Sequence, residues 1–492
     1  MAIDTTTSPT APTREPLGAP RLSTRGKLVL FVLCAAQFMV ALDFSVLNVA
    51  LPRLGADLGM SRSALQWAVT AFALPSGGFL LLFGRAGDLF GRRRLFLTGL
   101  ALFGAASLLA TLAWDPASFL TGRALQGLGA AAIVPTGMSL LTTTFPEGPA
   151  RDRALGISGT LLSLGFTVGM VAGGVLTDAL GWRSTMALLT VFALVVLPLA
   201  PGLLPESLPH SPDGMGGAPV SGRPRLDVPG AVTVTGGLLS LIYALSTAAG
   251  HGFGRADVVA ALIAGLALLT VFAVVESRSA APLVSLPMLR RRTVAWGNLG
   301  GLVTFSMMST VIFVLTLYLQ EILRLSAFET GLVFGVQGVL SALAGARAPK
   351  VIGRFGARRT LVGSLAGQGA LIAALLGLNA HIWSVWLAAA AVSLASVCHL
   401  GAIISYGLTV TSGVPDEEQG LATGLVTTTQ QVGVTVGIPL LGVLATTSGG
   451  DLLSGVHTVL ALDAVIVLAA AALVALGLRG RGAQPVSGPV EP

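Results

Sequence analysis

Long uninterrupted runs of apolar residues dominate this chain. Fourteen stretches of about 20 residues, the length that a helix needs to cross a bilayer, are bounded by charges or by Pro and Gly clusters. They cover residues 27–50, 63–83, 95–113, 119–142, 154–177, 184–204, 228–248, 256–275, 296–319, 328–347, 360–378, 382–408, 420–445 and 456–478. Strands of a membrane barrel would instead alternate in polarity over about 10 residues. We therefore expect an all-α integral membrane protein with fourteen transmembrane helices.

The scarcity of charge excludes a soluble enzyme. Only 10% of the 492 residues are charged, against about 25% in soluble domains. A water-exposed surface with so few charges would leave large apolar patches. The net charge of +7 is mild for this length, so we expect contact with lipid headgroups and none with nucleic acid.

The distribution of Lys and Arg predicts how the chain is oriented. With the N-terminus in the cytoplasm, 23 of these residues fall on the cytoplasmic side and five on the opposite side. Positive residues concentrate on the cytoplasmic side of membrane proteins. We expect both termini to be cytoplasmic and the protein to be a multi-pass component of the cytoplasmic membrane.

An internal repeat predicts two related bundles. Residues 88–94, after the second run, and residues 353–359, after the tenth, share a Gly- and Arg-rich pattern at an offset of 265. Such duplication is common in transporters. The predicted organisation is a disordered cytoplasmic tail, a six-helix bundle, a Pro-rich cytoplasmic linker, an inserted helix pair, a second six-helix bundle and a second cytoplasmic tail. Their bounds are 1–26, 27–204, 205–227, 228–275, 296–478 and 479–492.

Three ionisable residues lie well inside predicted spans: Asp43, Arg123 and Asp463. A charge at the centre of a bilayer costs about 3 kcal/mol on insertion scales, so such residues are candidates for function. Asp43 is interpreted either as a group that loads and releases a proton or as a permanently paired structural carboxylate. Arg123 either exchanges partners with such a carboxylate or has a structural role. Asp463 either has a function or reaches the membrane surface.

A glycine-rich segment with an acid among arginines follows the second run. It contains Gly84, Asp88, Gly91, Arg92 and Arg93. We interpret it as a gating loop in which Asp88 forms a charge pair that breaks on rearrangement. Ordinary positive-inside anchoring would explain the arginines alone.

Small and polar residues inside the spans supply further candidates. Gly165, Gly169 and Gly173 repeat every four residues in the fifth run, followed by Gly174, and stripes of small residues let helices approach closely. Polar side chains in spans either bond between helices or line a substrate cavity. The cavity candidates are Gln37, Asn48, Gln66, Trp67, Gln337 and Gln430. Cys34 and Cys398 lie in apolar runs without ligand spacing, so we expect neither a metal nor another cofactor.

These motifs resemble those of the major facilitator superfamily, in particular its fourteen-span drug:proton antiporter family. Residues 42–52 are similar to that family's first-helix signature, 84–93 to the superfamily's loop between helices 2 and 3, and 123–129 to its helix 4 motif. The resemblance implies that Asp43 and Arg123 couple proton movement to transport. In the fifth helix, Met170 occupies the place where the antiporter motif usually has Pro.

The resemblance further implies alternating access, in which a hydrophobic drug, antibiotic or secondary metabolite leaves as a proton enters. The expected partners are this small molecule, protons and membrane lipids, with a monomeric protein. The composition, with Lys27 and Lys350 as its only lysines, is typical of actinomycetes. The alternatives are a proton-coupled importer or metabolite exporter of the same fold, and a non-transporting sensor or scaffold.

Overall fold

The computed structural model describes residues 23–145, 149–204, 228–252, 254–279, 286–414, 419–442 and 451–479. Every regular element in these ranges is a helix, so the all-α prediction is confirmed for them. The predicted linker and nearly all of both predicted tails lie outside the described residues. The exceptions are residues 23–26, because the first helix already begins at Thr24, and Arg479.

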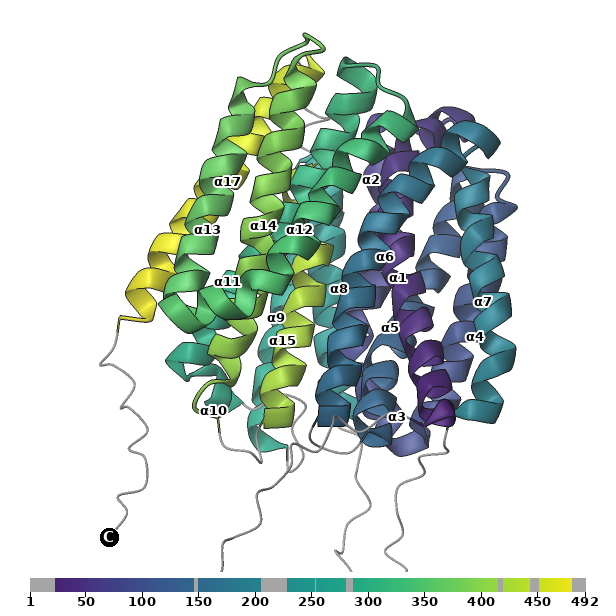
Figure 1. The fold of residues 1–492 in the computed structure, drawn as a ribbon, viewed down its shortest axis with the longest axis vertical. Coiled ribbons are helices and arrows are strands. Elements are labelled where there is room, and N and C mark those ends of the chain that lie inside the picture. Colours follow the sequence, from purple (N-terminus) through teal and green to yellow (C-terminus); the bar gives the residue numbers. More distant parts are fainter. Residues whose placement is uncertain are drawn as a thin grey trace, which may run out of the picture.

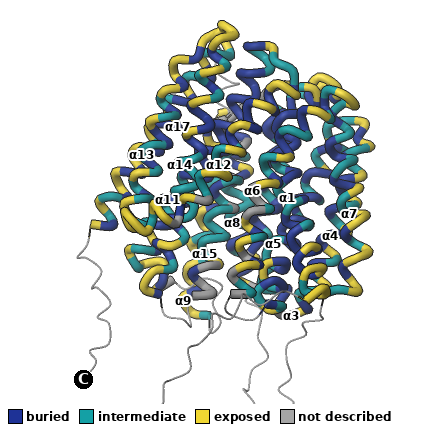
Figure 2. The backbone as a smooth tube through the Cα atoms, viewed as in Figure 1, coloured by how far each residue is buried: buried dark blue, intermediate teal, exposed yellow. Residues whose placement is uncertain are grey.

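The first half of the chain forms one helical bundle (Figure 1, purple to blue). Its elements are α1 (Thr24–Asp57), α2 (Arg62–Gly78), α3 (Leu80–Phe90), α4 (Arg92–Thr111), α5 (Pro116–Thr144), α6 (Pro149–Leu180) and α7 (Arg183–Leu203). Buried residues face the interior of the bundle and exposed ones its outer surface (Figure 2). In a chain this apolar, the exposed apolar side chains are the ones suited to contact lipid.

The second bundle (Figure 1, green to yellow) follows the short helix α10 (Leu286–Leu289). Its elements are α11 (Arg292–Leu317) with the π-helical turn η1 (Tyr318–Ile322), α12 (Ala327–Phe355), α13 (Ala357–Ala374) with η2 (Leu375–Gly377), α14 (Ser384–Thr411), α15 (Gln419–Gly437) with η4 (Ile438–Gly442), and α17 (Leu452–Gly477).

Two helices lie between the bundles in sequence, α8 (Val228–His251) and α9 (Ala256–Arg278). α8 packs on the first bundle, where Thr235 Oγ1 donates a hydrogen bond of 2.8 Å to the Gly78 carbonyl of α2. α9 packs mainly on α8, and only 11% of its most apolar stretch is buried. The pair is therefore attached through α8, which leaves most of α9 facing outward.

Eleven described helices are long and apolar enough to cross a membrane. The predicted ranges 63–83, 228–248 and 420–445 fall on α2 with α3, on α8, and on α15 with η4, which are not among the eleven. These elements are also helical, but their spanning the bilayer stays a prediction, as does the cytoplasmic location of the termini.

The predicted gating loop is wrong in its secondary structure. Residues 84–90 belong to α3, and only Gly91, at φ 100°, separates this helix from α4. In the second copy, Gly356, at φ 80°, separates α12 from α13 in the same way. Glycine tolerates this left-handed conformation, which stops a helix. The helices run past the apolar runs because charged residues end a membrane span without ending a helix.

A capping box fixes the start of α5, the helix that carries Arg123. The Asp115 carboxylate accepts a hydrogen bond of 2.7 Å from the Ser118 backbone N–H, and Ser118 Oγ bonds back to the Asp115 main chain. Pro116 occupies the first turn, where no intrahelical donor is needed. Hydrogen bonds from Ser118 hold the pKa of Asp115 below its usual range, so the cap stays ionised at neutral pH.

Candidate functional site

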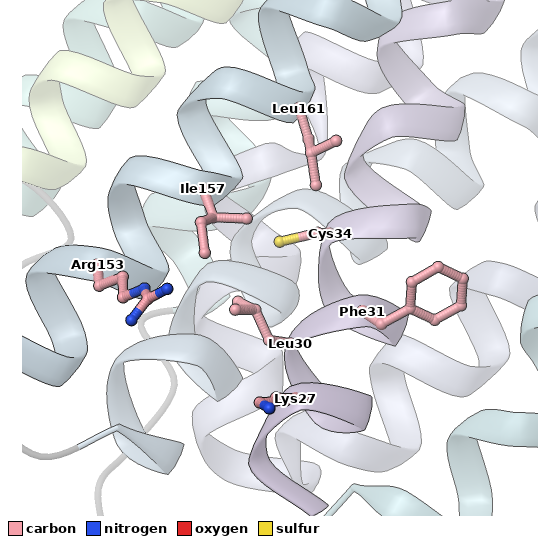
Figure 3. Close-up of a pocket in the computed structure, with 7 residues that line it drawn as sticks. All are labelled: Lys27, Leu30, Phe31, Cys34, Arg153, Ile157 and Leu161. Atoms are coloured by element: carbon pink, nitrogen blue, oxygen red, sulfur yellow. The ribbon is translucent and has the colours of Figure 1, made fainter. Parts of the chain in front are cut away.

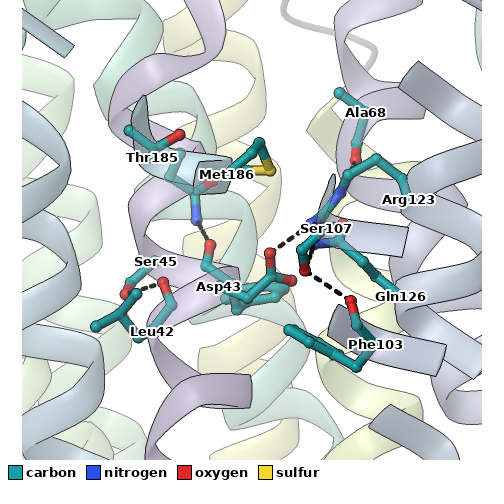
Figure 4. A network of polar contacts seen from close by, with 12 residues as sticks. Leu42, Asp43, Ser45, Ala68, Phe103, Ser107, Arg123, Gln126, Thr185 and Met186 are labelled. Carbon is teal, nitrogen blue, oxygen red and sulfur yellow. Dashed lines mark hydrogen bonds and ion pairs between the residues drawn. The ribbon is translucent and has the colours of Figure 1, made fainter. Parts of the chain in front are cut away.

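Two of the three ionisable residues predicted to lie inside spans meet in the first bundle. Arg123 Nη1 of α5 donates to Asp43 Oδ1 of α1 at 2.6 Å, and both side chains are 0% exposed. The pair is charge-assisted and shielded from water, which is where such bonds are strongest. The sequence singles out the two residues separately, and the structure brings them together (Figure 4).

Arg123 is held from three directions besides Asp43. Its Nε donates to the Ala68 carbonyl of α2 at 3.1 Å, and Nη1 also donates to Gln126 Oε1 at 2.8 Å. Its Cζ lies 4.6 Å from the ring centroid of Phe72, so the ring face stabilises the cation. These contacts orient the guanidinium whether or not Asp43 is ionised, because none of them depends on the carboxylate.

The polar network continues into α4. Gln126 Nε2 donates to Ser107 Oγ at 2.8 Å, and Ser107 Oγ donates to the Phe103 carbonyl at 2.7 Å. Gln126 and Ser107 are absent from the predicted site. The available signal was the i, i+3 spacing of Gln126 from Arg123, which places both on one face of a helix. A serine in an apolar helix carries no such signal.

One oxygen and one nitrogen of the central pair have no partner among the described residues: Asp43 Oδ2 and Arg123 Nη2. Buried polar atoms are nearly always hydrogen-bonded, so an unpaired one needs an explanation. An unpaired carboxylate oxygen next to a cation is a position that a proton or a ligand donor can occupy. Occupation of that oxygen would leave the bonds from Arg123 to Ala68 and Gln126 in place.

The α6 glycine stripe lets α1 approach closely beside the pair. A Cβ at Gly165 would lie 2.9 Å from the Phe38 carbonyl oxygen, at Gly169 3.0 Å from that of Leu42, and at Gly173 2.9 Å from that of Val46. Only glycine permits such contacts. α1 and α6 therefore approach closely along the stripe, which forms a smooth surface directly behind the α1 segment that carries Asp43.

Met170 and Gly174, next to the glycine stripe on α6, lie against the other bundle. A Cβ at Gly174 would lie 2.6 Å from the Ala327 carbonyl oxygen of α12, and a Cβ at Gly331 would lie 2.6 Å from the Met170 carbonyl oxygen. Met170 is fully buried within an α6 that continues unbroken from Pro149 to Leu180. Met170 and Gly174 thus contribute to the interface between the bundles.

Polar contacts join the bundles at their distal ends, which we define as the ends away from both described termini. The Phe328 N–H at the start of α12 donates to Asp178 Oδ2 of α6 at 2.7 Å. Asp178 also pairs with Arg53 of α1. Gln320 Nε2 of η1 donates to the Val49 carbonyl of α1 at 2.9 Å. We call this set of contacts the distal closure.

The predicted cavity candidates lie on four helices, α1, α2, α12 and α15, and their lining of a substrate cavity stays a prediction. Gln37 Oε1 accepts a hydrogen bond of 3.0 Å from Ser158, Asn48 Nδ2 donates to the Phe44 carbonyl of its own helix at 2.8 Å, and the Trp67 ring lies 6.3 Å from that of Tyr243. The other three belong to different helices. Gln66 is buried in α2, Gln337 is buried in α12, and Gln430 is half-buried in α15.

The glycine- and arginine-rich motif lies on α3 and at the start of α4. A Cβ at Gly84 would lie 3.6 Å from Pro135 of α5, so α3 packs on that helix. Arg93 donates to the Pro201 carbonyl of α7, and Arg92 is half-buried one residue after Gly91. The side chain of Asp88 is outside the described part of the structure, so its predicted charge pair stays a prediction.

Asp463 is not brought to the Asp43 pair. It lies in α17 of the second bundle, 0% exposed, and neither carboxyl oxygen has a hydrogen-bond partner among the described residues. The interpretation that Asp463 reaches the membrane surface is therefore wrong, because its side chain points into the bundle. Among the described residues, no three His, Cys, Asp or Glu side chains are grouped so that they could hold a metal ion.

The chain is similar to known transporters along most of its length. Residues 33–349 and 297–491 match the family model of the Major Facilitator Superfamily. A cephamycin export protein of Amycolatopsis lactamdurans is 38% identical over 84% of this chain and 83% of its own. A puromycin resistance protein of Streptomyces alboniger is 37% identical over 85% and 81%. The crystal structure of a POT family transporter matches 94% of this chain and 98% of its own with a TM-score of 0.70 at 16% identity, which shows a shared fold.

Proposed function

The chain belongs to the Major Facilitator Superfamily, and on that premise we propose that it exports a hydrophobic antibiotic or secondary metabolite in exchange for protons. It is a multi-pass protein of the cell membrane. The export direction is supported by the relatives, whose names describe antibiotic export or resistance. The actinomycete composition agrees with their source organisms.

The topology belongs to the same proposal. We infer fourteen spans, made of the eleven long apolar helices together with α2 and α3, α8, and α15 with η4. An even number of spans puts both termini on one side, and the bias of 23 against five basic residues favours the cytoplasm. In this orientation the distal ends of the bundles lie on the side of the membrane opposite the cytoplasm.

The buried Asp43–Arg123 pair carries the proposal of proton exchange. A guanidinium group stays charged in proteins, so we assign the exchanged proton to the Asp43 carboxyl group. Protonation of Asp43 replaces an ion pair of 2.6 Å with a weaker bond to a neutral acid. The contacts with Gln126, Ala68 and Phe72 then keep the arginine in place. A substrate and a proton would compete for this site, which is the requirement for exchange.

Movement of α1 would couple this titration to alternating access. Asp43 ties α1 to α5, while the glycine stripe lets the opposite side of α1 slide on α6. When protonation loosens the tie to α5, α1 is free to shift along the smooth surface. The same helix carries Val49 and Arg53, which contact η1 and α6 at the distal closure. A shift of α1 would therefore open or close that side.

The positions of the acids in the described parts of α11 to α15 narrow the class of substrate. In the described parts of α11 to α15, Glu321 lies in the turn η1 and Glu329 in the first turn of α12, and the apolar middle of these helices has no carboxylate. A doubly charged cation in the membrane interior would need compensating acids. We therefore propose a neutral, zwitterionic or singly charged hydrophobic compound.

Transport in a sensitive host tests the function. Cells that express the protein should accumulate less puromycin or cephamycin than cells without it, and the difference should vanish when an uncoupler collapses both the pH gradient and the voltage. Increased accumulation would show import. Extrusion that continues undiminished after collapse would overturn proton exchange. Purified protein in liposomes that moves neither compound nor any of a panel of hydrophobic drugs under an imposed pH gradient would overturn the transporter proposal.

A further inference from the structure

A groove lies between α1 and α6 at the ends of these helices away from the distal closure. It has a volume of about 530 Å³, which falls in the range of small-ligand sites. Lys27, Leu30, Phe31 and Cys34 line it from α1, and Arg153, Ile157 and Leu161 line it from α6 (Figure 3). Their spacings of three and four residues place each set on one face of its helix. None of these residues belongs to the Asp43 network.

The groove opens on the outer surface of the bundle. Leu164, Val168 and Val175 continue the face of Ile157 and Leu161 along α6, and they are 46%, 38% and 44% exposed. On α1, the Phe31 side chain is 57% exposed. Exposed apolar side chains along the surface of a membrane protein contact lipid. An acyl chain that lies in the groove would therefore be continuous with the surrounding bilayer.

Two cations lie at the end of the groove, and none of the described residues that line it is an acid. The side chains of Lys27 and Arg153 are exposed and form no hydrogen bond or ion pair with another described residue. Arg151, by contrast, is engaged by the Phe145 and Thr142 carbonyls at 3.1 and 2.8 Å. Lys27 and Arg153 come from different helices, and both line this one groove. Their charge complements a phosphate, and the lining beyond them complements a hydrocarbon chain.

We propose that this groove binds an anionic phospholipid of the inner leaflet, such as phosphatidylglycerol, with its phosphate between Lys27 and Arg153 and an acyl chain along Leu30, Ile157 and Leu161. Basic pockets between transmembrane helices on the cytoplasmic side suit such headgroups. A lipid in this position bridges α1, which carries Asp43, and α6, which packs against α12. The inference rests on the proposed cytoplasmic location of the termini, and it is independent of the transported compound and of proton exchange.

Photocrosslinking tests the site. Purified full-length protein in phosphatidylcholine nanodiscs receives a small fraction of phosphatidylglycerol with a diazirine in its acyl chain, and crosslinked peptides are located by mass spectrometry. We expect labelling of residues 27–34 and 153–161. Each cation near a membrane surface contributes about fivefold in affinity, so Lys27→Gln with Arg153→Gln should reduce this labelling about 25-fold. The charge-preserving exchange Lys27→Arg with Arg153→Lys should retain most of it.

Two controls separate the proposal from its alternatives. Lys350→Gln with Arg354→Gln removes two exposed cations from α12 of the other bundle and should leave labelling of the groove unchanged. A diazirine phosphatidylcholine should label it far less, and soluble glycerol phosphate should not compete. Equal labelling by both lipids, or labelling that survives neutralisation of Lys27 and Arg153, would show an unspecific lipid contact and overturn the proposal. Displacement by glycerol phosphate would show a soluble anion site instead.

Discussion

Replacement of Asp43 by Asn tests the proposed coupling most directly, because it removes one charge and preserves the shape of the side chain. Opposite unit charges at the 2.6 Å that separates Arg123 Nη1 from Asp43 Oδ1 attract by about 6 kcal/mol at an effective dielectric constant of about 20. Desolvation offsets much of this attraction, and removal of one partner from a buried pair costs about 3–5 kcal/mol. Arg123 keeps its bonds to Gln126 and Ala68 and its contact with Phe72. We therefore expect a loss of about 3 kcal/mol in the free energy of unfolding, at the lower end of that range.

The assay compares two modes of transport in proteoliposomes that contain purified Asp43→Asn protein. Accumulation of puromycin against its gradient, driven by an imposed pH difference, should fall to background. Exchange of labelled for unlabelled puromycin without a gradient should continue, because it needs no change in protonation. If a proton competes with the drug at Asp43, the affinity of the wild-type protein for puromycin should rise by up to tenfold for each unit of increase in pH, over the pH range in which Asp43 loses its proton. The variant should lose this dependence.

Asp257→Asn provides the matched control. It makes the same chemical change in an ion pair with Arg255 at 2.8 Å, but the side chains of Asp257 and Arg255 are 36% and 48% exposed, and such surface pairs contribute little to stability. Its transport should equal that of wild type. Uphill transport at the wild-type rate by Asp43→Asn, or an unchanged pH dependence of drug binding in that variant, would refute the role of Asp43.

Three further changes probe the contacts around the pair. Gly169→Val should separate α1 from α6, since even a Cβ at this position would lie 3.0 Å from the Leu42 carbonyl oxygen. Gly156→Val should be tolerated, because a Cβ at Gly156 would have no atom within 4 Å. The yield of folded protein and the transport rate measure both effects, and normal activity of Gly169→Val would contradict a close contact. Gln126→Leu should lower the free energy of unfolding by about 1–3 kcal/mol, because it leaves Arg123 and Ser107 with fewer hydrogen-bond partners. The midpoint of thermal unfolding should fall accordingly, and an unchanged midpoint would show that this network does not contribute to stability. Asp178→Asn should weaken the distal closure by removing the negative charge that faces Arg53 and the Phe328 N–H. A thiol reagent should then modify the reporter Val49→Cys faster than it does with Asp178 in place. Equal rates of modification with and without Asp178→Asn would argue against this closure.

Local pattern was sufficient to locate the helices. The described part of each long apolar run is helical, with the run 63–83 divided between α2 and α3, because a chain segment in lipid must satisfy its own backbone hydrogen bonds and a helix does so within the run. Gly91 and Gly356, recognised as equivalent by their offset of 265, both adopt positive φ between two helices. The resemblance to the Major Facilitator Superfamily, which depends on short motifs, is confirmed by similarity along most of the chain.

Hydropathy was less informative about where helices end. The run predicted to stop at residue 83 continues as α3 to Phe90, and the one predicted to stop at residue 347 continues in α12 to Phe355. Polarity marks the limit of the membrane, whereas the end of a helix depends on local backbone conformation. The expectation of a loop failed for this reason.

The amino-acid sequence alone determined that the chain is helical, that it belongs in a membrane, and that Asp43 and Arg123 are costly there, since these properties depend on the transfer of single residues and short segments from water to lipid. Only the tertiary structure decided that the two residues pair with each other, that Gln126 and Ser107 extend their network, and that Asp463 is buried apart from it. Such contacts join residues on helices separated by up to 80 positions. They depend on how helices rotate and pack against one another, which no periodicity within a single helix specifies.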